Sequence, residues 1–109
     1  MAISITNVRR TSLQNGEVMV YGNFTFDNVY ATGGEIMDLS AHILSTDTPH
    51  IVVTGDDGWM CQVDRGTAAA NVVLAYGSAD TNAAVNQEAA VSTDLSAVIG
   101  TFIAIGQTA

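Results

Sequence analysis

The sequence lacks lysine altogether and contains a single cysteine and a single proline. Its three arginines stand against 11 acidic residues, which gives a formal net charge of −8 at pH 7. A chain with so few cations has no positive patch to contact a phosphate backbone, so we expect no nucleic-acid partner. The lone Cys61 excludes an intramolecular disulfide. Hydrophobic residues make up 48% of the chain and charged residues only 13%, a composition that supports a packed core and argues against disorder.

Long apolar runs are missing as well. No stretch approaches the roughly 20 residues that span a bilayer, because glycine, aspartate and asparagine interrupt the longest candidates. The segment Met1–Thr6 has neither the basic start nor the continuous apolar run of a secretory signal. We therefore expect no membrane partner and a protein that stays in the cytoplasm where it is made. The length of 109 residues predicts one domain, spanning 1–109.

Apolar and polar residues alternate through most of the sequence, which is the pattern of half-buried strands. In the segment 17–26 the apolar side chains fall on even positions, with Gly22 in phase: Val18, Val20, Phe24 and Phe26. At 3.6 residues per turn these side chains would scatter around a helix. The pattern therefore predicts a strand with one face in the core.

A hairpin is predicted near the start of the sequence. Ile3 and Ile5 alternate with polar residues in a first strand, and Asn15-Gly16 is a dipeptide whose positive φ angles suit a type I′ turn. The phase breaks after Ile5, so the first strand either carries a bulge or ends near Asn7.

Further strands are predicted at 36–39, 51–54, 59–63, 71–76 and 101–106, with loops at 27–34 and 78–90. The composition of 55–58 is that of a reverse turn, which predicts a hairpin of 51–54 with 59–63 and, with 71–76, a three-stranded meander. The continuous apolar run at 101–106 predicts a strand buried on both faces. Seven or eight short strands at regular spacing predict an all-β sandwich or barrel.

Shared faces can be read from the same alternation. Trp59 falls in phase with Cys61 and Val63, so we place it in the core, and Leu74 shares a face with Val72 and Tyr76. A short echo is also present, because Asp38–Ile43 recurs as Asp94–Ile99 with five of six residues unchanged. Six residues do not establish a repeat fold. We interpret both copies as tight turns in which Asp accepts a backbone hydrogen bond and Leu anchors the turn in the core.

Signals for catalysis or metal binding are weak. His42 and His50 lie near Asp38 and Asp47 in sequence, but the spacing of zinc ligands is absent. The segment 56–58 begins like a calcium loop whose later positions lack their ligands, and no nucleophile elbow is present. We therefore expect no enzyme, no metal and no cofactor. A small hydrolase would require both histidines to converge with a carboxylate in a cleft.

Three residues are candidates for an interface: Arg9, Arg10 and Tyr30. The two arginines are the only adjacent cations in an acidic chain, and they mark a place where an acidic partner can dock, although they also suit a strand edge. Tyr30 falls in a predicted loop, where either an interface role or a core role is open.

Several segments in the last three quarters of the chain resemble a known family. They are Tyr30–Ser40, which contains Gly-Gly-Glu and Asp-Leu-Ser, then Gly58–Asp64 with the 71–76 strand, and Thr93–Ile99 leading to Phe102–Gly106. These segments resemble the capsid decoration, or cement, proteins of tailed bacteriophages.

The resemblance implies an antiparallel β-sandwich, jelly-roll-like, bound to the outside of the virion capsid and assembled in the host cytoplasm. It implies the major capsid protein as a partner and homo-oligomers, with trimers favoured. It carries over no catalytic or ligand residues. The alternative is a carbohydrate- or receptor-binding module of a phage tail or fibre, which would require Trp59 to lie exposed beside Tyr30.

Overall fold

The computed structural model describes residues 3–27, 29–31, 33–55, 59–77, 87–88 and 94–109. Residues 56–58 of the predicted turn at 55–58 and most of the predicted loop at 78–90 lie outside these residues. The strands are β1 (Ser4–Ser12), β2 (Glu17–Thr25), β3 (Glu35–Met37), β4 (His50–Thr54), β5 (Met60–Asp64), β6 (Asn71–Gly77), β7 (Gln87–Glu88) and β8 (Ile99–Gln107). The described part contains no α-helix, only the 3₁₀ turn Gln14–Gly16, and no helix in it is long and apolar enough to cross a membrane.

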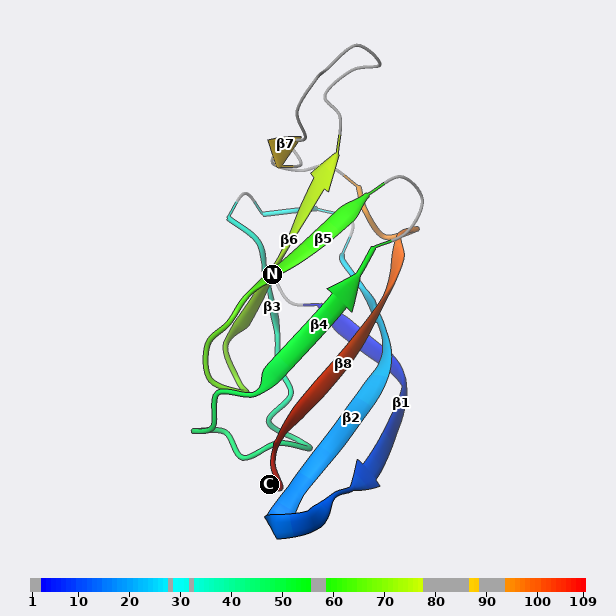
Figure 1. The fold of residues 1–109 in the computed structure, drawn as a ribbon. Helices are drawn as coiled ribbons and strands as arrows, with labels where there is room; N and C mark the ends of the chain where they lie inside the picture. The colour runs from blue at the N-terminus through cyan, green and yellow to red at the C-terminus, as the bar shows by residue number, and fades with distance from the viewer. Residues whose placement is uncertain (1–2, 28, 32, 56–58, 78–86, 89–93) are drawn as a thin grey trace.

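The strands form two antiparallel sheets (Figure 1). One has the order β1-β2-β8-β4, and the other has the order β3-β6-β5, with β7 paired to β6. From β2 to β5 the chain changes sheet at every connection. The predicted all-β fold, a single-domain antiparallel β-sandwich, is confirmed.

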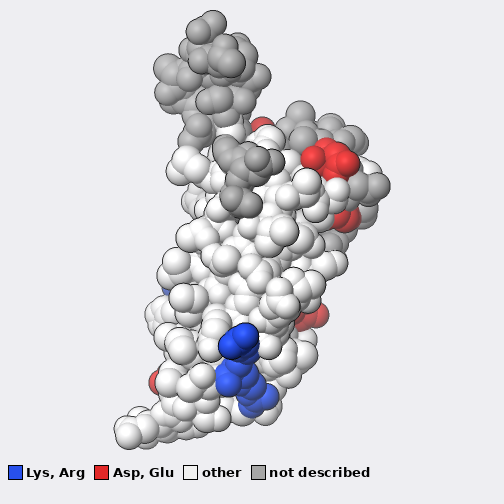
Figure 2. Space-filling model, turned by 90° about the vertical axis from the view of Figure 1, so that its right-hand side faces the viewer, with Lys and Arg blue, Asp and Glu red and all other residues white. Residues whose placement is uncertain are grey.

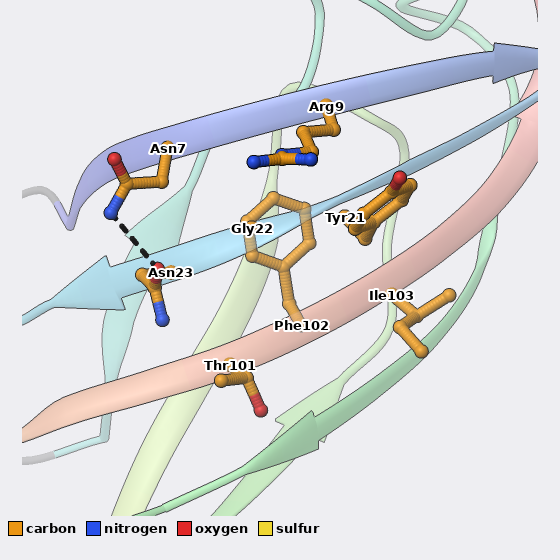
Figure 3. A pocket seen from close by; sticks show the side chains of 8 residues that line it. All are labelled: Asn7, Arg9, Tyr21, Gly22, Asn23, Thr101, Phe102 and Ile103. Atoms are coloured by element: carbon orange, nitrogen blue, oxygen red, sulfur yellow. Dashed lines mark hydrogen bonds between the residues drawn. The ribbon is translucent and has the colours of Figure 1, made fainter.

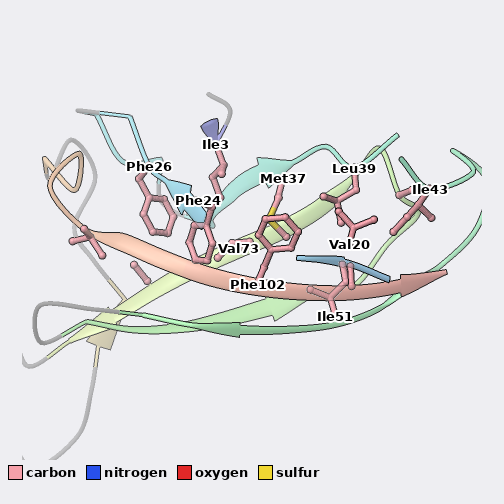
Figure 4. Close-up of a cluster of buried hydrophobic side chains, with 14 of the residues drawn as sticks. Ile3, Val20, Phe24, Phe26, Met37, Leu39, Ile43, Ile51, Val73 and Phe102 are labelled. Carbon is pink, nitrogen blue, oxygen red and sulfur yellow. The ribbon is translucent and has the colours of Figure 1, made fainter. Parts of the chain in front are cut away.

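The core lies between the two sheets (Figure 4). Phe24, Phe26 and Tyr30 pack edge to face in sequence, with ring centroids 5.8 and 5.6 Å apart. Phe102 of β8 and Val73 of β6 bring the two layers together beside them. Because these side chains come from both sheets, neither sheet buries its apolar face alone.

The first hairpin forms as predicted. Asn15 and Gly16 have φ angles of 64° and 75°, as a type I′ turn requires. Of the two outcomes left open for the first strand, the structure has the bulge: pairing with β2 shifts between Thr6 and Arg9, and Asn7 has a φ of 53°. The strand then continues to Ser12.

The predicted hairpin of 51–54 with 59–63 is wrong. β4 pairs with β8 and β5 pairs with β6, so the chain crosses between the sheets after Gly55. The crossing lets Ile51 and Cys61 face one core from opposite layers, whereas a hairpin would have placed both in one sheet. Of the predicted meander, only the β5–β6 pair is present.

One strand face also differs from the expectation. β8 is not buried on both faces: its inward residues are buried, but Ile103 on the opposite side is 49% exposed. In β6, Val72, Leu74 and Tyr76 share a face, as predicted, and alternate with buried residues. Gly77 among the buried residues leaves room for the ring of Trp59, which lies where a side chain at this position would go.

Both copies of the Asp-Leu-Ser echo form the predicted turn. The Ser40 amide donates to Asp38 Oδ1 over 2.9 Å, and the Ser96 amide donates to Asp94 Oδ1 over 3.0 Å. The two leucines, Leu39 and Leu95, are buried. Hydrogen bonds from Ser96 lower the pKa of Asp94.

Candidate binding face

One side of the four-stranded sheet is covered by no described part of the chain, and we call it the outer face. The strand register arranges its side chains in rows across the sheet. The middle row is Arg9, Tyr21, Ile103 and Val52; beside it lie Thr11, Met19, Ile105 and His50 on one side and Asn23, Thr101 and Thr54 on the other. The rows follow from alternation, since directly paired residues project to the same side.

The centre of the outer face is apolar and open. Val52 is 65% exposed and Ile103 is 49% exposed, and Met19, Tyr21 and Ile105 beside them are half-buried. Threonine and asparagine side chains border this centre on the row of Thr101. An apolar centre with a polar margin, containing tyrosine and arginine, has the composition of a protein–protein contact.

A pocket of about 490 Å³ opens at the β1 side of this face (Figure 3). Six side chains surround it, namely Asn7, Arg9, Tyr21, Ile103, Thr101 and Asn23, with Gly22 and Phe102 between them. Asn7 Nδ2 donates to Asn23 Oδ1 over 3.2 Å, and Asn23 Nδ2 donates to the Gly100 carbonyl over 3.4 Å.

The bulge in β1 determines the shape of this pocket. It brings the β1 backbone against Gly22, where an added Cβ would lie 2.9 Å from the Thr6 carbonyl oxygen and 3.2 Å from Val8 Cα. Only glycine leaves room for this approach. The extra residue of the bulge also turns the Asn7 side chain toward Asn23.

The outer face differs in charge from the rest of this acidic protein. Its strands place a single carboxylate on it, Glu17, at one end of the sheet. Arg9 lies on it with no hydrogen-bonding or ion-pair partner among the described residues, whereas Arg65 donates through Nε to the Pro49 carbonyl over 3.0 Å. Figure 2, which views the molecule from the β1 side, shows a compact cationic patch in the lower part of this side, next to mostly uncharged surface.

The three interface candidates do not come together. Arg9 lines the pocket, and Arg10 is exposed on β1 on the opposite side of the strand, in register with the inward Val20. Tyr30 is 0% exposed, so of the two roles left open for it the structure has the core role. Its hydroxyl donates to Glu88 Oε2 over 2.7 Å and accepts from the Ala75 amide over 3.2 Å, and burial raises its pKa.

The other residues considered for chemistry are dispersed. Trp59 is half-buried and packs against the core, as predicted. His50 is exposed on β4, while His42 is half-buried. Asp47 accepts a hydrogen bond from the Gln107 amide over 2.8 Å. In the described ranges no three His, Cys, Asp or Glu side chains are grouped so that they could hold a metal ion.

Sequence reasoning found Arg9 but missed its neighbours in the pocket. Tyr21 and Asn23 fall on the polar phase of β2, so the alternation already placed them outside the core. What the sequence lacked was the pairing of β2 with β8, which brings Thr101 and Ile103 beside them. No family model, curated protein or solved structure matches this chain.

Proposed function

We propose that the protein is a structural virion protein that binds the outer surface of a tailed-phage capsid and reinforces the shell. The observation that carries the proposal is the open apolar centre of the outer face. Val52 and Ile103 are exposed there, although the sandwich has a separate core of buried apolar side chains between its sheets. Contiguous exposed apolar side chains favour a protein partner. The sequence resemblance to capsid decoration proteins adds the kind of partner, the major capsid protein.

The physical basis is mass action. A protein that binds the assembled lattice but not free subunits stabilises the lattice by an amount set by its concentration and affinity. The net charge of −8 keeps a covered particle soluble and repels nucleic acid, which suits the capsid exterior. Self-association, with a trimer as the favoured state, belongs to the same proposal and places several copies on one local symmetry axis.

Electron microscopy of particles purified with and without this protein tests the proposal. We expect extra density on the head exterior only when the protein is present, and a higher temperature of shell disruption in the same sample. Density on the tail, or unchanged particles at saturating protein, would reject it.

A second candidate function is a carbohydrate- or receptor-binding module of a tail or fibre. The polar ring of the pocket favours it, since amide and hydroxyl groups around a tyrosine suit a sugar. The aromatic platform that this function was expected to use is not formed, because Tyr30 is buried and Trp59 packs against the core. Tail density in the same microscopy would favour this alternative.

A further inference from the structure

We propose that the pocket on the outer face binds the carboxylate of an acidic side chain in an extended, otherwise apolar segment of a partner protein. The inference deepens the proposed function and rests on it for the partner, which would be the shell protein. It names the chemistry that the shell must present: Asp or Glu, with apolar residues next to it.

The hydrogen bonding within the pocket favours one anionic group. Asn7 and Asn23 already bond to each other, and Asn23 also bonds to the Gly100 carbonyl. Thr101 is hydrogen-bonded to Thr54 across the strands. These bonds engage part of the donors and acceptors that a sugar would need. Arg9 is the one charged side chain that lines the pocket, and its guanidinium matches a carboxylate with two parallel hydrogen bonds.

The surroundings strengthen such a contact and set its geometry. Arg9, Tyr21, Ile103 and Val52 stand side by side on four adjacent strands. At about 4.8 Å between strands, Ile103 lies about 10 Å from Arg9 and Val52 about 14 Å away. An extended chain advances about 3.3 Å per residue and points every second side chain to the same side. A carboxylate on Arg9 therefore places the side chain two residues later, about 7 Å along, between Tyr21 and Ile103. The side chain four residues later, about 13 Å along, lies near Val52.

Charge complementarity selects an acidic partner over a second copy of this face. Two outer faces packed together would bring Arg9 against neutral residues or another arginine, because Glu17 at the sheet end is their only carboxylate. An acidic partner segment supplies the missing charge. Apolar contacts around the ion pair keep water away and raise its strength.

The first test uses small probes in solution. ¹⁵N-labelled protein is titrated with glucuronate and with N-acetylglutamate and N-acetylglutamine, the last two capped as N-methylamides so that only the glutamate side chain carries a carboxylate. The ionic strength is held constant, and amide shifts are followed by NMR. We expect N-acetylglutamate to shift the amides of Asn7, Arg9 and Thr101, N-acetylglutamine to leave them unchanged, and Arg9→Gln to weaken binding about tenfold, as loss of a charged hydrogen bond predicts.

Arg10→Gln is the matched control, since it removes the same charge from the next residue, whose side chain does not line the pocket. Equal weakening by R9Q and R10Q, or equal shifts with N-acetylglutamine, would overturn the inference. Tighter binding of glucuronate than of N-acetylglutamate would overturn it in favour of a saccharide.

The second test uses shells that lack this protein. Wild-type protein should bind them, R9Q should bind about tenfold more weakly, and R10Q should stay within about twofold of the wild type. Shell binding that R9Q leaves unchanged overturns the inference but not the proposed function. If the wild-type protein binds N-acetylglutamate but not the shells, the proposed function is rejected, while the inference that the pocket binds a carboxylate stands. If R9Q changes the oligomeric state measured by sedimentation, the pocket binds a second copy of this chain. That result would overturn the inference that its partner is the shell protein.

Discussion

At the scale of single residues, Glu35 is a carboxyl group inside the sandwich. It is 1% exposed at the start of β3. Its Oε1 accepts a hydrogen bond from the Asp27 amide over 3.4 Å, and Oε2 has no partner among the described residues. Burial raises the pKa of Glu35, and the nearby charge of Asp27 acts in the same direction. The protonated form is therefore the one that the fold favours.

This burial predicts a dependence of stability on pH. Because the folded-state pKa of Glu35 is raised, its contribution is fully present below the ordinary glutamate pKa and is lost as pH rises through the folded-state value. Glu35→Gln should remove this loss, so the free energy of unfolding of the variant should fall less between pH 4.5 and pH 8 than that of the wild type. Urea unfolding from pH 4.5 to 8 measures it, with the half-buried Glu17→Gln as the control. The prediction would be contradicted if the free energy of unfolding of the wild type rose from pH 4.5 to 8 and that of E35Q rose by the same amount.

Cys61 gives a second prediction at this scale. Burial raises the pKa of its thiol from 9.0 to about 11, so the reactive thiolate is scarce at pH 8. Labelling with a disulfide reagent should be about a hundredfold slower in the folded protein than in urea, since two pKa units change the thiolate fraction by that factor. Absorbance of the released thiolate gives both rates. Equal rates in the two conditions would show that the thiol is not held inside the fold.

At the scale of elements, the β1 bulge and Gly22 of β2 depend on each other. A methyl group at residue 22 would meet the Thr6 and Asn7 carbonyl oxygens at 2.9 and 3.2 Å, and these are backbone atoms that cannot rotate away. Gly22→Ala should therefore destabilise the protein by roughly 1 to 3 kcal/mol. Amide hydrogen exchange should show that protection is lost mainly in β1. Thr25→Ala on the outer phase of β2 is the control, and unchanged β1 protection in G22A would refute the close approach.

The elements that sequence predicted correctly are those fixed by local chemistry. Asn15-Gly16 supplies both positive φ angles of its turn, and each Asp-Leu-Ser turn closes through a hydrogen bond two residues away. Such signals need no knowledge of the rest of the chain. The hairpin at 51–63 failed because a turn composition does not say whether the chain returns in the same sheet.

The candidate site was less predictable, for a related reason. Arg9 was found because its charge is rare in this chain, but the residues around it come from β2 and β8, which the sequence did not pair. The role of Tyr30 was left open because its partners, Ala75 and Glu88, lie 45 and 58 residues away. Burial of a loop residue is decided by such distant neighbours and not by its own segment.

At the scale of the whole molecule, charge is unevenly distributed. The outer face holds Val52 and Ile103 with a single carboxylate at its end, while the other described carboxylates lie on loops and on the smaller sheet. Exposed apolar side chains also occur on the smaller sheet, where Met60 is 62% exposed and Ile36 is 44% exposed, so the low charge distinguishes the outer face more than its apolar area does.

Exposed positions on the outer face can be changed without unfolding the protein. Val52→Asp with Ile103→Asp places two carboxylates directly opposite each other on neighbouring strands, so it should lower the free energy of unfolding by roughly 1 to 2 kcal/mol and abolish shell binding. The matched control is Ile36→Asp with Gln62→Asp, which adds the same charge to the outside of the smaller sheet. Thermal unfolding and co-sedimentation with shells give the two readouts. If only the control variant lost shell binding, the contact with the shell would lie on the smaller sheet and not on the outer face.

The position of β8 has a consequence for biosynthesis. This strand comes after all the others along the chain, yet it sits between β2 and β4 in the sheet. While a ribosome has not yet released residues 99–107, β2 and β4 share no neighbour, and each keeps an open edge. Translation of this one segment therefore closes the sheet in a late step. In nascent chains stalled before β8, the unpaired edges of β2 and β4 are accessible to chaperones, to proteases and to other nascent chains.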